Sequence, residues 1–589
     1  MKKTKIVSTL GPASNTTDII VKLIESGANV FRFNFSHGDH EEHLARMNMV
    51  REAEKITGKL VGIVLDTKGA EIRTTVQENG SFIAHTGDVI RISMDDSLTG
   101  TPDKIAVTYK GLYDDTHVGG HVLIDDGLVD LKITAKDEAN KELVTEVQNE
   151  GKIGSRKGVN APGVEIRLPG ITEKDADDIR FGCDNNINFI SASFVRKAAD
   201  VLDIREILEE KHAENVKIFP KIESQEGIDN IKEIMKVSDG LMVARGDMGV
   251  EIPFENVPFV QKALIKMCNA LGKPVITATQ MLDSMQENPR PTRAEVTDVA
   301  NSVLDGTDAT MLSGESANGD YPVKAVATMS RINKRTEQEM KKRNTLALQR
   351  FEEYKGSNAT ESIGESVVRT AEELKVKAIV CATNSGYTAR MISKYRPNAD
   401  ILAITFDEKT ERSLTVNWGV TPILADRPNS TDEMFEVAAQ KAQDLGFAKE
   451  GDLILIVAGV AVGESGTTNV MKVQLIGSKL AQGQGVGDET VVGKAVVADN
   501  AKDAIAKAVD GGILVVKTTD KDYLPAIEKS SAIVVETGGL TSHAAVVGIA
   551  MGIPVVVGAA DATSLVKDGE LITVDSRRGV IYRGASNSL

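Results

Sequence analysis

The stretch VKIFPKIESQEGIDNIKEIMKVSDGLMVARGD, residues 216–247, decides the fold. It begins with an apolar run from Val216 to Lys221, continues through a segment with a helical pattern, and ends with a second apolar run from Gly240 to Arg245. Charged residues follow each run. Two strands separated by a helix are typical of a parallel sheet, because the chain needs a long return to start the next parallel strand.

The same pattern recurs through the first 312 residues and predicts eight strands with helices between most of them. The expected strands are Lys5 to Leu10, Asn29 to Phe35, Leu60 to Asp66, Ile187 to Ser193, Val216 to Lys221, Gly240 to Arg245, Pro274 to Thr279 and Thr307 to Leu312. Eight such units predict an α/β fold built on a closed (β/α)8 TIM barrel.

An insert separates the third and fourth predicted strands. Residues 70–168 are rich in alternating apolar and polar runs with Gly and Asp turns, which predicts a small β-barrel domain. Because it follows the end of a barrel strand, we expect it to act as a hinged lid over the mouth where barrel active sites lie. The catalytic barrel is then expected over residues 1–69 and 169–345.

Two further α/β domains are expected after the barrel, over residues 346–473 and 474–589. A charged helical stretch from Ala325 to Glu353 precedes them. Their predicted strands are Ala378 to Ala382, Ile401 to Thr405, Leu453 to Val457, Gly493 to Ala498, Gly512 to Lys517, Ala532 to Glu536 and Ile553 to Val557. Thr537 to Ala560 has no charged residue, but its Gly and Pro residues predict a helix from His543 to Met551 and a strand rather than a membrane span.

Composition narrows the class of protein. The chain has 589 residues, 41% of them hydrophobic and 26% charged, which is ordinary globular usage and predicts about four domains. A net charge of −16 argues against broad binding to nucleic acid or to an anionic membrane. Three scattered cysteines, Cys183, Cys268 and Cys381, and no signal-peptide pattern favour the cytoplasm.

Polar residues at the predicted strand ends indicate a chemistry. Glu223 and Asp247 follow neighbouring strands, which lie about 4.8 Å apart, and could together bind one hard divalent cation. Lys221 adds positive charge at the same mouth. One such residue alone is most often an exposed loop-end charge, but their joint occurrence on consecutive strands favours phosphoryl transfer, where catalysis is mainly charge neutralisation and positioning.

Six segments in order resemble the signature segments of the pyruvate kinase family. They begin at Arg32 (RFNFSHG), Asp66 (DTKGAEIR), Pro220 (PKIES), Ala244 (ARGDMG), Ala278 (ATQML) and Asn288 (NPRPTRAE). With the lid and third domain, the resemblance covers residues 1 to 473. It implies transfer of phosphate from phosphoenolpyruvate to ADP, the last step of glycolysis, in a cytoplasmic homotetramer.

The resemblance also implies roles for individual residues. Lys221, Arg32 and Thr279 correspond to catalytic positions. Positions that contact phosphoenolpyruvate are Arg32, Lys221, Gly246, Asp247 and Thr279. Nucleotide positions are Asn34, His37, Arg73 and Lys157. Glu223 and Asp247 correspond to ligands of Mg2+ or Mn2+.

A potassium site is implied as well. Asn34, Ser36, Asp66 and Thr67 resemble the family's monovalent-cation site, an all-oxygen set with one formal charge that suits K+. Glu71 favours the potassium-dependent form of the family. The sequence departs from the family at Ala70, where Pro is usual.

An effector site is expected in the third domain. Thr383, Ser385, Gly386 and Thr388 follow a strand and open a helix, an arrangement that suits an anion but also ordinary helix capping. In pyruvate kinases the similar segment binds a phosphate of an allosteric sugar phosphate, together with a glycine-rich loop that resembles residues 459–468.

The last domain resembles the mobile phosphohistidine domain of phosphoenolpyruvate-utilising enzymes. Its segment Glu536 to Ala545 (ETGGLTSHAA) places His543 at the position of the phosphorylated histidine. No domain that would exchange phosphate with this histidine is recognised, so a structural or regulatory role is favoured.

Two other functions remain open from the sequence. A barrel lyase or aldolase could use the same Mg2+ carboxylates on an enolate of pyruvate, but Arg73, Lys157 and the lid, which serve a nucleotide, argue against it. A catalytically idle sugar-phosphate sensor is expected to lose Lys221 or a metal ligand, and neither is lost.

Overall fold

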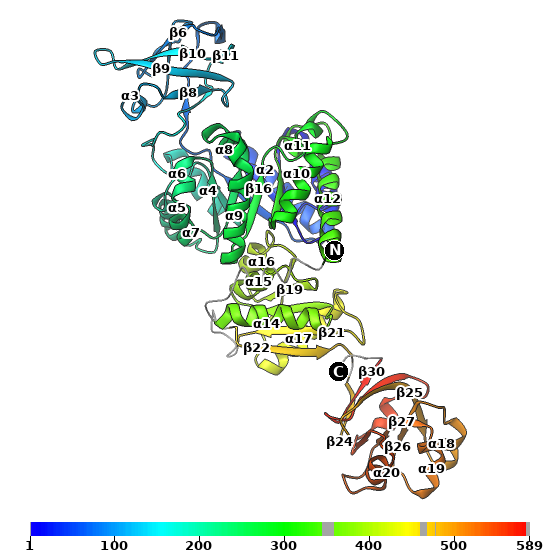
Figure 1. Cartoon of the computed structure of the whole chain (residues 1–589). Helices are drawn as coiled ribbons and strands as arrows, with labels where there is room; N and C mark the ends of the chain where they lie inside the picture. Colours follow the sequence, from blue (N-terminus) through cyan, green and yellow to red (C-terminus); the bar gives the residue numbers. More distant parts are fainter. Residues whose placement is uncertain (1, 344–358, 460–467, 478, 585–589) are drawn as a thin grey trace. The chain divides into compact units, whose positions relative to one another are not determined.

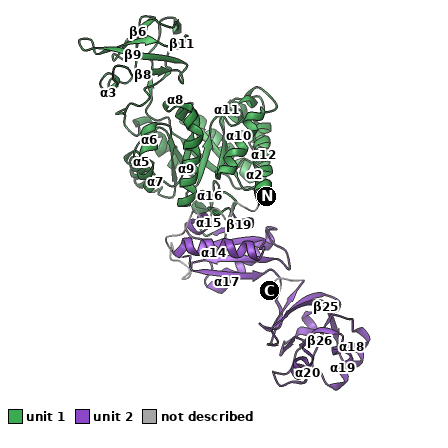
Figure 2. Cartoon of the chain, viewed as in Figure 1, with its two compact units in different colours: residues 1–355, 393–396, 405–424 green, residues 356–392, 397–404, 425–589 purple. Residues whose placement is uncertain are grey.

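The computed structural model describes residues 2–343, 359–459, 468–477 and 479–584. Its contacts divide the chain into two compact units (Figure 2). The first comprises residues 1–355, 393–396 and 405–424, and the second comprises the rest.

Eight parallel strands of the first unit form a closed barrel in the order β1-β17-β16-β15-β14-β13-β3-β2. Figure 1 labels β16 of this barrel together with several of the helices around it. The strands are β1 (Lys5–Thr9), β2 (Val30–Asn34), β3 (Gly62–Asp66), β13 (Phe189–Ala192), β14 (Lys217–Ile222), β15 (Leu241–Ala244), β16 (Val275–Ala278) and β17 (Ala309–Leu312). Each overlaps its predicted run. The expected TIM-barrel fold is confirmed.

Helices surround the barrel, and the longer ones bury apolar residues, such as Ile20 and Leu23 of α1 and Leu264 and Ile265 of α9. They are α1 (Thr17–Ser26), α2 (His40–Thr57), α4 (Glu173–Asp184), α5 (Ala198–Glu210), α6 (Gln225–Asp229), α7 (Ile231–Val237), α8 (Arg245–Glu251), α9 (Val257–Leu271), α10 (Arg293–Asp305), α11 (Gly314–Ala317) and α12 (Pro322–Arg343). The side chains of Thr16, Asp39, Thr172 and Thr292 cap helix N-termini by accepting backbone N–H groups. The predicted helix to Glu353 is observed as far as Arg343, and residues 344–353 lie outside the described ranges.

The inserted segment forms a separate β structure within the first unit. A seven-stranded sheet has the order β4-β12-β8-β9-β10-β6-β7, and β11 pairs with β5. The strands are β4 (Ile72–Arg73), β5 (Ser81–Ala84), β6 (Val89–Ser93), β7 (Lys104–Ala106), β8 (His121–Ile124), β9 (Val129–Asp137), β10 (Glu142–Val147), β11 (Gly151–Gly154) and β12 (Gly158–Asn160), with the short helix α3 (Leu112–Asp115).

Two connections join this insert to the barrel. Gly69 has a φ of 74°, and a Cβ there would come within 2.8 Å of Ser193 and Phe194, so this position needs glycine. On the other connection, the Arg196 guanidinium donates to the carbonyls of Ile166 at 2.7 Å and Leu168 at 2.6 Å. Both ends of the insert are therefore fixed by contacts with the barrel.

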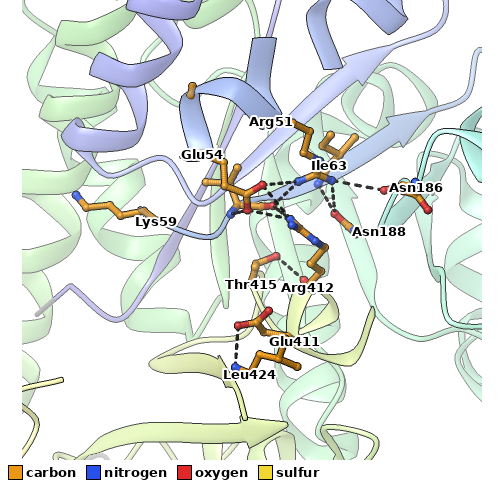
Figure 3. Close-up of polar contacts among 12 residues, drawn as sticks. Arg51, Glu54, Lys59, Ile63, Asn186, Asn188, Glu411, Arg412, Thr415 and Leu424 are labelled. Atoms are coloured by element: carbon orange, nitrogen blue, oxygen red, sulfur yellow. Dashed lines mark hydrogen bonds and ion pairs between the residues drawn. The ribbon is translucent and has the colours of Figure 1, made fainter. Parts of the chain in front are cut away.

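The first unit also includes residues 405–424, with α16 (Glu408–Ser413) and β20 (Val420–Leu424). Figure 3 shows the contact that holds this segment to the barrel: Arg412 donates to Glu54 of α2 at 2.8 Å. Glu54 also accepts the Arg51 guanidinium at 3.2 Å. These contacts lie at the end of the barrel where the strands begin.

The described residues of the second unit form two sheets. The first has β18 (Ala378–Ala382) between β19 (Asp400–Thr405) and β21 (Leu453–Ala458), and β22 (Val470–Leu475) pairs antiparallel with β21. Its helices are α14 (Ala359–Glu373), α15 (Tyr387–Ser393) and α17 (Thr431–Asp444). The sequence predicted β18, β19 and β21 but not β22.

The C-terminal sheet has eight strands in the order β23-β30-β29-β25-β26-β27-β28-β24. They are β23 (Lys479–Gln482), β24 (Gln484–Val486), β25 (Thr490–Ala498), β26 (Gly512–Val516), β27 (Ser530–Val535), β28 (Val555–Val557), β29 (Leu571–Asp575) and β30 (Val580–Arg583), accompanied by α18 (Ala501–Lys507), α19 (Leu524–Ile527), α20 (His543–Met551) and α21 (Ala562–Leu565). The predicted helix at His543 is confirmed. Among the described helices of the chain, none is long and apolar enough to cross a membrane.

Candidate functional site at the barrel mouth

The carboxyl ends of neighbouring barrel strands bring charged side chains together. Asn34 at the end of β2 pairs in register with Asp66 at the end of β3, which in turn pairs with Ser191 of β13. Arg32 of β2 donates through Nε to Asp66 Oδ2. Residues separated by more than 150 positions in the sequence therefore meet at one mouth, as the barrel geometry predicts.

Lys221 occupies the centre of this group. Its Nζ lies 3.4 Å from Asp66 Oδ1 and 3.0 Å from Glu223 Oε1, and it donates to Ser193 Oγ at 2.9 Å. Burial disfavours the ammonium charge, but the carboxylates of Asp66, Glu223 and Asp247 outweigh burial and raise the pKa of Lys221. The mouth thus holds a fixed positive charge at neutral pH.

Glu223 is the carboxylate whose bonding is incomplete. Its Oε2 accepts the Phe194 N–H at 2.6 Å. Its Oε1 is in ion-pair range of Lys221 but accepts no hydrogen bond from the described residues. Burial, with the charge of Asp247 adding to it, raises the pKa of Glu223 to about 8. A buried carboxylate oxygen that only one ammonium faces has room for a further positive partner, which fits a site for a divalent cation.

Gly246 and Asp247 lie in the first turn of α8, directly after β15, and Thr279 directly follows β16. The Gly246 N–H donates to Thr279 Oγ1 at 2.8 Å, so the two predicted substrate-contacting residues meet. Within the described ranges, no three His, Cys, Asp or Glu side chains are arranged as a metal cluster. A cation held by Glu223 and Asp247 would therefore need further ligands from substrate or water.

The predicted potassium residues lie on the ends of β2 and β3. Asn34 Oδ1 accepts the Ser36 N–H at 3.1 Å, and Thr67 Oγ1 accepts the Ser193 N–H at 3.0 Å. Burial alone would raise the pKa of Asp66, but Arg32 and then Lys221 outweigh it and lower that pKa. The set is adjacent, oxygen-rich and carries one ionised carboxylate.

Arg73 and Lys157, the predicted nucleotide residues of the lid, line a cavity of about 660 Å3 that Asp247 also lines. Both are paired with lid carboxylates. Arg73 donates to Glu71 at 2.7 Å, and Lys157 donates to Asp125 at 2.9 Å. His37 and Asn34 are absent from the residues that line this cavity, and the His37 side chain is exposed at the barrel mouth.

Ser193 is a polar residue of the mouth that the sequence motifs did not single out. It receives a hydrogen bond from Lys221, donates to the Thr67 carbonyl at 2.6 Å, and contacts Asp66 at 3.3 Å. The available signal was its place as the last residue of the fourth predicted strand, where barrel side chains converge.

Comparison with known proteins identifies the family. Residues 1–326 match the model of the pyruvate kinase barrel domain, and residues 361–474 match the model of the pyruvate kinase alpha/beta domain. The chain belongs to the pyruvate kinase family. The predicted pyruvate kinase activity is thereby confirmed, together with the enzyme class.

Individual pyruvate kinases are similar over the whole chain. Those of Lactobacillus delbrueckii subsp. bulgaricus and Bacillus licheniformis are 73% and 56% identical, each over 100% of both chains. A crystal structure of a pyruvate kinase from Cryptosporidium parvum has a TM-score of 0.76 at 40% identity, covering 81% of this chain and 96% of that one. Residues 508–579 match the model of the mobile domain of PEP-utilising enzymes, which confirms the resemblance of the C-terminal domain.

The predicted effector segment of this pyruvate kinase lies at the end of β18. Thr383 and Thr388 are buried, Ser385 is exposed, and Gly386 has a φ of 74°. The Thr388 hydroxyl is 2.8 Å from that of Thr468. A glycine-rich loop at residues 459–468 was predicted to assist this segment. Residues 460–467 of that loop lie outside the described ranges.

His543 is the first residue of α20. Its Nδ1 lies 3.0 Å from Thr519 Oγ1, and its side chain is partly exposed. The Ser542 hydroxyl beside it is buried and has no hydrogen-bond partner among the described residues. One hydroxyl therefore holds the histidine. These contacts do not test whether His543 takes part in turnover, so the structural or regulatory role of this domain stays a prediction.

Proposed function

We propose that this pyruvate kinase transfers the phosphoryl group of phosphoenolpyruvate to ADP at the barrel mouth, with Lys221, Arg32 and Thr279 as catalytic residues. The observation that carries the proposal is the Lys221 ammonium, which is buried among carboxylates. One of the carboxylates that act on its charge, Asp247, lines the cavity that Arg73 and Lys157 also line. A fixed ammonium in a buried mouth stabilises negative charge as it develops on the transferring phosphoryl group and the enolate.

Glu223 and Asp247 are proposed to hold Mg2+ or Mn2+, and the incomplete bonding of Glu223 supports this assignment. When bound, the divalent cation neutralises phosphate charge and orients the substrate. Asn34, Ser36, Asp66 and Thr67 are proposed to hold K+. Arg32 and Lys221 keep the Asp66 carboxylate ionised, as a cation ligand requires.

Phosphoenolpyruvate is proposed to contact Arg32, Lys221, Gly246, Asp247 and Thr279, and ADP to contact Asn34, His37, Arg73 and Lys157. The phosphates of ADP would replace the Glu71 and Asp125 carboxylates as partners of Arg73 and Lys157. Exchange of one anionic partner for another keeps these two partly exposed cations paired during binding.

A coupled assay tests this function. With phosphoenolpyruvate, ADP, Mg2+ and K+, ATP and pyruvate should form in equal amounts. Production of pyruvate without ADP would support the barrel lyase alternative. Binding of sugar phosphate without any turnover would support the idle sensor.

The segment Thr383, Ser385, Gly386 and Thr388 is proposed to bind a phosphate of an allosteric effector. Buried threonine hydroxyls and a glycine turn after β18 support an anion site. Ser385→Asp should abolish the response to added sugar phosphate and leave saturated turnover nearly intact, because the new carboxylate repels an anion. Loss of folding in this variant would favour simple helix capping.

Assembly and location complete the proposal. We expect a cytoplasmic homotetramer that binds neither nucleic acid nor membrane. Phe254 and Phe259 support self-association, because they expose 80% and 71% of their surface on the described barrel, an unusual cost in water for a monomer. Analytical ultracentrifugation should give about four times the mass of the 63.1 kDa chain. A monomer at micromolar concentration would contradict it.

A further inference from the structure

Thr279 and the residue after it have an unusual backbone conformation. Their φ angles are 68° and 53°, in the left-handed region that favours glycine. Thr279 is β-branched, and a β-branched residue with positive φ is a true outlier, so neighbouring contacts must hold it there. The strain lies at a residue proposed above to contact phosphoenolpyruvate.

Arg245 supplies these contacts. Its guanidinium donates to the Thr279 carbonyl at 2.6 Å and to the Ala278 carbonyl at 3.2 Å. Both carbonyls belong to the turn that closes β16. The planar guanidinium binds two consecutive carbonyls at once, and a Lys ammonium lacks this fixed fork.

The guanidinium is itself held in place from behind. Asp298 of α10 accepts from Arg245 Nη1 at 2.7 Å, and Gln261 of α9 accepts from the same nitrogen at 3.3 Å. The Arg245 side chain is only 11% exposed. Residues of α9 and α10 thus hold the Arg245 guanidinium so that it faces the strained turn after β16.

The strained turn determines where the Thr279 hydroxyl lies. Its Oγ1 accepts the Gly246 N–H at 2.8 Å and donates to the Ala278 carbonyl at 2.7 Å, the same carbonyl that Arg245 binds. Gly246 directly follows Arg245 and precedes Asp247. Arg245 therefore ties the end of β16 to the beginning of α8.

We infer that Arg245 is a positioning residue of the reaction: it holds the Ala278–Thr279 carbonyls so that Thr279 stays in its strained conformation and its hydroxyl meets the substrate site. This inference rests on the proposed role of Thr279. Arg245 acts through Thr279 and does not itself touch the reacting atoms.

Arg245→Lys is the first test. The variant keeps the positive charge beside Asp298 but loses the fork, and kcat should fall by about 100-fold, the usual cost of a misplacement near 1 Å. The KM for ADP should stay within about twofold, because the proposed ADP contacts are elsewhere. If the variant does not fold, Asp298→Asn should lower kcat by about tenfold by loosening the same guanidinium.

Arg205→Lys is the matched control. Arg205 also joins a carboxylate, that of Asp239, and a carbonyl, that of Val237 at 3.2 Å, but at the opposite end of the barrel strands. It should lose a similar amount of thermal stability and retain its kcat. An Arg245→Lys variant whose kcat stays within threefold of this control would overturn the inference.

Adding Gln280→Gly to Arg245→Lys tests whether the first variant loses kcat because the turn shifts or because the protein is destabilised in general. Gln280 is exposed and carries the second positive φ, which glycine adopts without strain. Added to Arg245→Lys, it should restore kcat by about fivefold or more, since a left-handed residue costs roughly that factor. The absence of any recovery would contradict the inference.

Thr279→Ala distinguishes the two claims. A low kcat in Thr279→Ala, with normal kcat in Arg245→Lys, rejects the inference and leaves the proposed role of Thr279 standing. A normal kcat in Thr279→Ala rejects the role of Thr279 and the inference with it.

Discussion

Each end of the barrel carries a cluster of charged side chains, and the carboxylate oxygens of the two clusters differ in how many hydrogen bonds they accept. At the base, both oxygens of Glu54 accept hydrogen bonds: Oε1 from the Val61 N–H at 3.1 Å and from Arg412 at 2.8 Å, and Oε2 from Arg51 at 3.2 Å (Figure 3). At the mouth, Glu223 Oε1 accepts no hydrogen bond from the described residues and has only the Lys221 ammonium, 3.0 Å away, as a charged neighbour.

The electrostatics differ in the same sense. At the base, burial and then the charge of Arg412 lower the pKa of Arg51, so two cations share one carboxylate. At the mouth, three carboxylates, those of Asp66, Glu223 and Asp247, face the two cations Lys221 and Arg32. The carboxylates raise the pKa of Lys221, and burial raises the pKa of Glu223 to about 8. A bound cation beside Glu223 would favour its charged form and so offset the effect of burial. We therefore interpret the mouth as a ligand site and the base as the point where residues 405–424 attach to the barrel.

Lys221→Met should give the largest effect. Turnover should fall by at least about 100-fold, the scale for one preorganised electrostatic donor, while phosphoenolpyruvate and Mg2+ still bind. Steady-state kinetics and metal titration by calorimetry measure both. Near-normal turnover would remove Lys221 from the mechanism.

Withdrawal of K+ should give the next effect. Wild-type activity should fall by at least about tenfold when a large organic cation replaces K+, since one charge at a partly buried site is worth on the order of 1–4 kcal/mol. Glu71→Lys should loosen the requirement by placing a fixed ammonium near the mouth. Equal activity of the wild type in both salts would show that no potassium site is needed.

Glu54→Gln tests the charged cluster at the base of the barrel, where we expect an effect on stability and little effect on turnover. It leaves Arg51 and Arg412 side by side without a countercharge, and the partly exposed cluster should lose about 2 kcal/mol of unfolding free energy. Saturated kcat should stay within about twofold. Urea unfolding followed by tryptophan fluorescence tests this, because Trp418 lies in the segment that Arg412 attaches. A large loss of kcat with unchanged stability would reverse the assignment of the two ends.

His543→Ala should have the smallest effect. The barrel is proposed to bind both substrates, so direct transfer needs no histidine relay, and kcat should stay within about threefold. Truncation after Gln474 should also preserve turnover, although loss of interdomain contacts can change stability or effector response. A tenfold loss of kcat in His543→Ala would show that the C-terminal domain takes a direct part in the reaction.

The sequence predicted the barrel strands and the residues at the barrel mouth because both depend on patterns within a few consecutive residues. Apolar runs locate the strands, and the residues directly after them, such as Glu223 and Asp247, must converge at one end. Arg245 was visible as a strand-end residue, but its partner Asp298 lies 53 positions away on another helix, which no local pattern predicts. The contact between Glu54 and Arg412 spans 358 positions and was not predicted for the same reason.

The central claim is that phosphate passes directly between the two substrates at the barrel mouth, and isotope labelling tests it most directly. The wild-type enzyme is incubated with phosphoenolpyruvate labelled in its phosphate, turnover is quenched in alkali where phosphohistidine survives, and label on protein and on ATP is followed in time. The account predicts label in ATP at the rate of turnover and no kinetically competent label on His543. Stoichiometric label on His543 that forms and discharges as fast as turnover would contradict it.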